Sequence, residues 1–232
     1  MERLVDYHCL APDFPGYGRS HAQEWVSLQE SANQIVEIIR KSTVNAHAHF
    51  VGLSLGGSVV ITLLSQAAEH VDHAIVDGAG VLPLPGLPLM KVGFRLLQPF
   101  LKTNFIIKTI AHSMKIPEEG YAAFKQGMVT MSAASFTRSF LQALSLRQPT
   151  GLERVTCPTL FVAGEKEPEA VRQSNRLLAR SMPHAQSCLA PGMGHGWLAA
   201  VPALHCQMVE AWINDAPLPQ ALVEVKMQTE FR

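Results

Sequence analysis

Short apolar runs alternate with longer amphipathic stretches along most of this chain, and this alternation most constrains its fold. Strands are expected at residues 7–11, 49–53, 73–76, 159–163 and 185–189, and helices at about 27–41, 55–69, 169–181 and 200–214. Strands separated by helix-length segments pair in parallel, because only a long crossover returns the chain to the same edge. The pattern therefore predicts an α/β fold, with a mostly parallel sheet and helices on both faces.

The segment 81–150 interrupts the alternation. It opens with three prolines and continues as amphipathic helical stretches without a strand pattern. We therefore expect a helical insertion within an α/β core. The chain divides into a first core part (1–80), the insertion (81–150), a second core part (151–216) and a short tail (217–232) expected to be frayed.

The whole chain has no net charge, but its parts carry opposite net charges. The 232 residues include 19 Lys and Arg against 19 Asp and Glu, which argues against nucleic-acid binding through bulk charge. The insertion alone carries a net charge of +6, and the remainder −6. A solvated helix surface would account for this, and so would attraction of anionic substrates or of an acidic membrane or protein surface.

Cysteine usage and the first residues indicate a cytoplasmic protein. The four cysteines lie far apart without a Cys-x-x-Cys pair, which is typical of free thiols in a reducing compartment. The first six residues are too charged to open a signal peptide. The longest uncharged run, 51–68, contains glycines and polar residues, so we expect a buried strand and helix and no integral membrane segment. His47 and His49 lack a third ligand at a recognisable spacing, so no metal or cofactor is expected.

The segment Gly52-Leu53-Ser54-Leu55-Gly56 matches the pattern G-x-S-x-G between an expected strand and an expected helix. A serine in such a turn projects its hydroxyl into a cleft, and small residues two positions to either side let the backbone turn sharply. Ser54 is therefore the candidate nucleophile. The backbone N–H of Leu55 would lie at a helix N-terminus, where it could stabilise an oxyanion. A glycine-rich turn without chemistry is the alternative.

A nucleophilic serine needs a base and an acid. Of ten histidines, His195 stands out, because it lies in a glycine-rich loop after the last strand. For the acid, the order Ser54, Glu167, His195 fits the order serine, acid, histidine. Asp77, at the end of an earlier strand, is the main alternative acid, and Glu165 is a third.

These segments together resemble the α/β-hydrolase superfamily, in its serine-nucleophile branch. The resemblance rests on PDFPGYGRS at 12–20, the turn at 52–57, Gly164-Glu165-Lys166-Glu167, and Gly194-His195. It implies that 81–150 is a helical cap. It also implies that the acid follows the strand-closing glycine by three residues, which gives Glu167 where aspartate is more usual.

The resemblance also implies strands that this sequence does not show. Family members begin with further strands, and a His-Gly loop after one of them supplies a second oxyanion N–H. We therefore expect either that Met1 is an internal methionine of a longer protein or that this is a shortened form.

Two functions follow from these features. The first is a serine hydrolase that cleaves a small carboxylic ester or related carbonyl substrate, expected to be apolar, through a Ser54-His195-Glu167 triad and an acyl-enzyme. The second is a catalytically silent hydrolase-like fold that binds a ligand or a protein. The insertion supplies apolar residues for a pocket or for its own core: Phe94, Leu97, Phe100, Phe105, Phe124, Met128, Met131, Phe136 and Phe140. The oligomeric state stays open.

Overall fold

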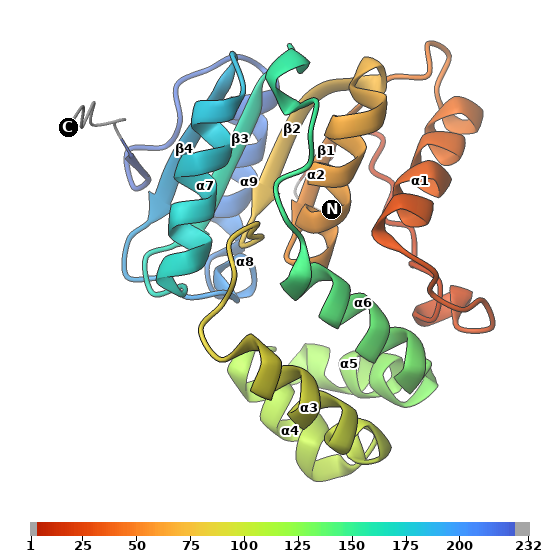
Figure 1. Ribbon diagram of the computed structural model, residues 1–232. Coiled ribbons are helices and arrows are strands. Elements are labelled where there is room, and N and C mark those ends of the chain that lie inside the picture. The colour runs from red at the N-terminus through yellow and green to blue at the C-terminus, as the bar shows by residue number, and fades with distance from the viewer. Residues whose placement is uncertain (1–3, 226–232) are drawn as a thin grey trace.

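The computed structural model describes residues 4–225, in which five strands form one sheet in the order β1-β2-β3-β4-β5 (Figure 1). The strands are β1 (Ala48–Leu53), β2 (Val71–Asp77), β3 (Thr159–Gly164), β4 (Ala185–Ala190) and β5 (Val223–Glu224). The first four pair in parallel, and β5 runs antiparallel to β4. The predicted α/β class with a mostly parallel sheet is confirmed.

Helices cover both faces of the sheet. They are α1 (Leu28–Ser42), α2 (Leu55–Ala67), α7 (Glu169–Ser181), α8 (Trp197–Ala200) and α9 (Pro202–Ile213). Short 3₁₀ turns lie at Gly18–Ser20, Ala68–His70, Gln98–Phe100 and Leu152–Arg154. α2 and α7 pack on one face with α1 against α2, whereas α8 and α9 cover the other face (Figure 1).

Side-chain alternation along the central strands divides the core between these faces. Ala74 and Val76 of β2 join Phe161 of β3 in the cluster beneath α2 and α7. Ile75 and Leu160 point the opposite way, into the cluster beneath α9. A strand buried on both faces reads as a continuous apolar run, which is why β2 and β3 are visible in the sequence.

Local signals place most helix ends where the sequence predicts them. The Ser27 hydroxyl accepts a hydrogen bond from the Glu30 N–H at 3.0 Å and caps α1. The expected helix at 169–181 has those bounds in α7. The expected helix at 200–214 is instead broken at Val201, because a proline at 202 disfavours helical backbone in the residue before it.

The expected strand at 7–11 is wrong. These residues form no ladder with the sheet and are mostly exposed. The Tyr7 hydroxyl accepts a hydrogen bond from Asn214 Nδ2 at 2.7 Å, and Leu4 packs against the cluster beneath α9. The segment is therefore held by side chains near the end of α9, and its backbone stays out of the sheet.

The expectation of a frayed tail is wrong for residues 217–225. Val223 and Glu224 pair with Leu189 and Cys188 of β4, and the Val225 N–H donates to the Ser187 carbonyl. Residues 226–232 lie outside the described part of the chain. The uncharged run 51–68 forms the end of β1 and α2. Between residues 4 and 225, no helix has both the length and the apolar character needed to cross a bilayer.

Between β2 and β3 the chain forms the helices α3 (Leu87–Leu97), α4 (Asn104–Ser113), α5 (Glu118–Thr130) and α6 (Ala133–Ser145). They lie below the sheet in Figure 1, on the side where α8 begins. Ser174 on α7 fixes the first residues of this insertion by hydrogen bonds. The buried Ser174 hydroxyl accepts hydrogen bonds from the N–H groups of Val81 and Leu82, at 2.9 and 3.0 Å, and donates to the Ala170 carbonyl.

The loop before α1 is fastened to α6 of the insertion. Trp25 is fully buried, and its indole N–H donates to Gln142 Oε1 at 2.9 Å. The same oxygen accepts the Leu28 N–H at 3.2 Å, and the Trp25 N–H donates to the Ser135 hydroxyl. One amide oxygen of α6 therefore satisfies two donors of the amino-terminal segment.

Replacing Gln142 by leucine should destabilise the fold, because the Trp25 indole and the Leu28 amide would lose their acceptor. We expect Gln142→Leu to lower the free energy of unfolding by about 1–3 kcal/mol in urea denaturation. Gln126→Leu on α5 is the matched control, since that exposed side chain makes no hydrogen bond to the described residues. Equal midpoints for the two variants would contradict the role given to Gln142.

Candidate active site

The carboxyl ends of four parallel strands bring the candidate residues to one edge of the sheet. Ser54 follows β1, Glu167 lies in the loop after β3, and His195 lies in the loop after β4. Hydrogen bonds extend the ladder beyond the strand ends: the Ser54 N–H donates to the Asp77 carbonyl at 2.8 Å, and the Gly78 N–H donates to the Val162 carbonyl at 3.0 Å. In open parallel sheets this edge is where ligands bind.

Ser54 occupies a strained turn between β1 and α2. Its φ of 55° and ψ of −110° lie where residues with a side chain seldom occur, at a cost on the order of 1–3 kcal/mol. A Cβ on Gly52 would lie 2.4 Å from the Gly56 carbonyl oxygen, so position 52 requires glycine. The expectation for Gly56 is wrong, because a Cβ there would meet nothing within 4 Å. Gly57 is the constrained residue, against the Ala79 side chain.

The backbone N–H of Leu55 begins helix α2. The first N–H groups of a helix have no acceptor within it and lie at the positive end of its dipole. This N–H is thus available to an anionic group beside Ser54.

His195 and Glu167 form a close pair. His195 Nδ1 lies 2.7 Å from Glu167 Oε1, and the Glu167 side chain is 3% exposed. The hydrogen bond to Glu167 raises the pKa of His195, against the effect of partial burial, and the charges of Glu167 and Asp77 raise it further. The pair therefore favours a protonated imidazole, which is the state a general base reaches after taking a proton.

Gly78 connects this pair to the turn at Ser54. A Cβ on Gly78 would lie 2.8 Å from Glu167 Oε1 and 3.0 Å from the His195 ring, so Glu167 and His195 pack directly on the Gly78 backbone. The preceding residue, Asp77, accepts the hydrogen bond from the Ser54 amide. The Ser54 amide and the His195 ring thus both lie against the peptide unit that joins Asp77 to Gly78. The Ser54 hydroxyl itself makes no hydrogen bond to any described residue.

Neither alternative carboxylate is hydrogen-bonded to His195. Asp77 is fully buried on the α8–α9 side, where Oδ1 accepts the Trp197 indole N–H at 3.1 Å and Oδ2 lies 3.4 Å from His205 Nε2. Glu165 Oε2 accepts the Gly192 N–H at 2.7 Å and braces the loop that carries His195. Sequence reasoning missed the partners of Asp77, although Trp197 lies only two residues beyond His195.

The insertion reaches this edge at Gly196. A Cβ on Gly196 would lie 2.6 Å from the carbonyl oxygen of Met114, the residue that follows α4. The residue next to His195 therefore carries a backbone contact with the insertion that only glycine permits. One sign of this contact is visible in the sequence, namely Gly196, the glycine that directly follows His195.

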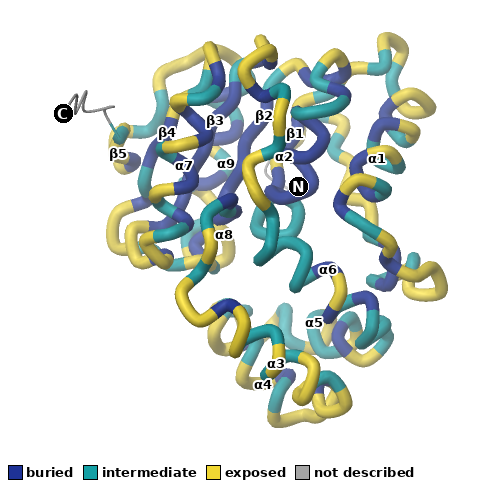
Figure 2. Tube along the Cα trace, viewed as in Figure 1, coloured by how far each residue is buried: buried dark blue, intermediate teal, exposed yellow. Residues whose placement is uncertain are grey.

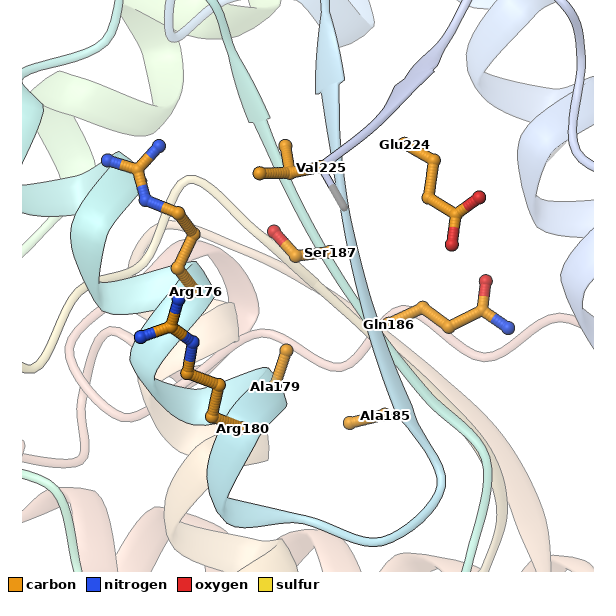
Figure 3. A pocket seen from close by; sticks show the side chains of 8 residues that line it. All are labelled: Arg176, Ala179, Arg180, Ala185, Gln186, Ser187, Glu224 and Val225. Atoms are coloured by element: carbon orange, nitrogen blue, oxygen red, sulfur yellow. The ribbon is translucent and has the colours of Figure 1, made fainter. Parts of the chain in front are cut away.

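Other candidate positions lie apart from this edge. His47 Nδ1 lies 3.2 Å from Asp72, and among residues 4–225 no three His, Cys, Asp or Glu side chains are grouped as metal ligands. Figure 3 shows a hollow between α7 and the start of β4, lined by residues that include Arg176 and Glu224. His195 follows the opposite end of β4, so this hollow is separate from the candidate active site.

Comparison with known proteins identifies the class. A model of the "Alpha/beta hydrolase family" matches residues 1–205. The chain therefore belongs to the alpha/beta hydrolase family, and it is a hydrolase by that membership. It is 26% identical over 223 residues to an AB hydrolase superfamily protein of Gibberella zeae, covering 92% of this chain and 73% of that protein.

Further relatives agree with this assignment. Lipase 3 of Moraxella sp. is 22% identical over 210 residues, covering 84% of this chain and 65% of the lipase. The solved structure of a thermophilic esterase from Thermogutta terrifontis superposes with a TM-score of 0.70 at 18% identity, covering 88% of this chain and 78% of the esterase. That structural likeness shows the fold.

Adding a methyl group at Gly78 should loosen the His195–Glu167 pair, because the new Cβ would press on both side chains. We expect Gly78→Ala to lower the pKa of His195 toward its ordinary value of about 6.5, measured by NMR titration. Gly86→Ala is the control: Gly86 also has a positive φ, but a Cβ there meets nothing within 4 Å. The same His195 pKa in both variants would show that Gly78 does not govern the pair.

Proposed function

We propose that this chain hydrolyses small carboxylic esters through Ser54, His195 and Glu167. The observation that carries the proposal is the 2.7 Å contact between His195 Nδ1 and the buried Glu167 carboxylate, packed on the Gly78 backbone beside the Ser54 turn. A buried carboxylate that accepts from Nδ1 leaves Nε2 as the proton acceptor. Asp77 and Glu165 have other partners, which supports Glu167 as the acid.

The reaction proceeds in two transfers of the acyl group. Nε2 of His195 takes the Ser54 hydroxyl proton while the serine oxygen attacks the ester carbonyl, and the Leu55 N–H donates to the oxyanion. The C–O bond to the alcohol then breaks, and His195 gives its proton to the departing alkoxide. Water attacks the acyl-enzyme with His195 again as base, which releases the carboxylic acid and restores Ser54.

The packing of the insertion supports a cap role for residues 81–150. Met128 and Met131 are buried in the insertion's own core, and Phe94 packs on Phe140 with ring centroids 4.4 Å apart. The Met114–Gly196 contact brings these helices to the site. Relatives named as a lipase and as an esterase act on esters, in agreement with this proposal.

The division into a core of 1–80 and 151–216 around this cap is part of the same proposal. We also propose a cytoplasmic location, which the four free cysteines support.

A fluorophosphonate probe should label the folded protein at the Ser54 oxygen, since the base that activates this oxygen toward an ester also activates it toward phosphorus. We expect Ser54→Ala to abolish labelling, as measured by mass spectrometry of the intact chain. Ser65→Ala, which removes a hydroxyl from the same helix, should label like wild type. Labelling that survives Ser54→Ala would exclude Ser54 as nucleophile, and a wild-type chain that resists the probe would favour the silent, ligand-binding alternative.

Replacing Glu167 by glutamine should change both the rate and its pH dependence. His195 acts as base only when neutral, and its pKa is raised chiefly by Glu167, so the wild-type rate falls as pH drops below that raised pKa. In Glu167→Gln we expect rates of p-nitrophenyl ester hydrolysis reduced by about 10²–10⁴-fold, with the acid limb moved to lower pH.

Two further variants test which carboxylate is the acid. Glu165→Gln should leave the acid limb in place, because Glu165 binds the Gly192 amide and not His195. Asp77→Asn should move the limb less than Glu167→Gln, because Asp77 acts on His195 only through its charge. A larger effect at Asp77 than at Glu167 would transfer the acid role to Asp77.

A further inference from the structure

The outer part of the insertion holds large apolar side chains in solvent. Leu89 and Leu96 of α3 are 78% and 70% exposed, Phe100 in the next turn 56%, and Phe105 at the start of α4 77%. Figure 2 shows α3 and α4 at the margin of the molecule with long exposed stretches. Phe100 and Phe105 therefore belong neither to a pocket nor to the core of the insertion.

The exposed stripe is not needed to hold the insertion together. Leu89 and Leu96 lie seven residues apart, about two helical turns, and so share one side of α3. The helices are anchored instead by Leu87, Leu101 and Ile107, which are buried. An apolar stripe that the fold leaves bare is typical of a surface that binds a partner.

Charge restricts what that partner can be. Residues 78–117 contain five Lys and Arg and no Asp or Glu. Lys102 and Lys108 are exposed, and Lys108 follows Phe105 by three residues on α4, which places the two on one side of that helix. If two copies of the chain met through this surface, Lys and Arg of one copy would face Lys and Arg of the other. Their repulsion disfavours self-association through it. The surface is complementary to a partner that is both apolar and anionic.

We propose that this outer face, formed by Leu89, Leu96, Phe100, Phe105, Lys102 and Lys108, binds the surface of an anionic lipid bilayer. Basic helices with protruding Leu and Phe lie in the boundary between headgroups and acyl chains, where their cations meet anionic lipid. A bilayer accepts protruding side chains without a matching pocket, whereas anchor residues between proteins fill packed pockets. The protrusion of these four apolar side chains therefore favours a membrane over an acidic protein.

Docking in this orientation would bring lipid close to the candidate active site. Phe105 lies in the first turn of α4, and Met114 just beyond its end contacts Gly196. The helix between them is about 15 Å long at 1.5 Å per residue. The docking does not depend on the proposed catalysis, although it would place an ester-cleaving site at a lipid surface.

Vesicle sedimentation tests the proposal with the full chain. We expect binding to vesicles of equimolar phosphatidylcholine and phosphatidylserine, at least tenfold weaker binding to phosphatidylcholine alone, and weakening in about 0.5 M salt. Leu96→Ser with Phe105→Ser should lower partitioning at least tenfold. Lys102→Gln with Lys108→Gln should lower it about fivefold per charge.

The control is Val44→Ser, which alters a fully exposed apolar residue after α1, outside this surface. It should bind like wild type. All variants should keep the wild-type melting temperature and fluorophosphonate reactivity without vesicles, since the altered side chains are exposed and outside the candidate active site.

Insertion can be followed by fluorescence. Trp25, Trp197 and Trp212 are buried, so Phe105→Trp would add the one exposed indole among the described residues. Its emission should shift to the blue with phosphatidylserine vesicles and stay unchanged with phosphatidylcholine. No vesicle binding, binding indifferent to the Leu96 and Phe105 changes, or binding to polyglutamate but not to vesicles would overturn the proposal. A concentration-dependent dimer abolished by those changes, without vesicle binding, would also overturn it.

Discussion

The parallel hydrogen-bond ladder at the carboxyl ends of β1, β2 and β3 determines which side chains can meet. Leu53 pairs with Asp77, and Asp77 with Val162, and the ladder continues through the amides of Ser54 and Gly78. A slip of one residue would exchange the two faces of β2, because side chains alternate along a strand. The register therefore delivers Ser54 and the Gly78 backbone to the same edge, where His195 and Glu167 pack.

The same alternation distinguishes Asp77 from Glu167, the two buried carboxylates that the sequence alone left as alternative partners of His195. Ile75 and Asp77 are two residues apart, so Asp77 shares the face of β2 that Ile75 turns toward α9. There its oxygens lie against Trp197 and His205. Glu167 is free of this restriction because it follows β3 in a loop. The period of two along β2 is thus enough to turn the Asp77 carboxylate away from a hydrogen bond with His195.

Features carried by neighbouring residues could be predicted, and features set by distant contacts could not. The cap at Ser27 and the apolar runs of β2 and β3 are local, and their elements lie close to where the sequence places them. The backbone at 7–11 has strand-like composition but is held by Asn214, more than two hundred residues away. Gly56 and Gly57 are adjacent in the pattern, yet only the approach of Ala79 shows which of them must lack a side chain. The Met114–Gly196 contact likewise depends on tertiary packing.

The hydroxyl of Ser174 has a mechanical consequence. It holds the amides of Val81 and Leu82 with both lone pairs while its proton is used on the Ala170 carbonyl, so its hydrogen-bonding capacity is full. The chain between Gly78 and Leu82 is thereby clamped to α7 before the insertion helices begin. If α3 moved, the backbone would bend at residues beyond Leu82. The Gly78 backbone, on which His195 and Glu167 pack, would keep its position. The Gly78 side of the candidate active site is thus held in place independently of α3, and the Met114–Gly196 contact is the insertion's direct link to that site.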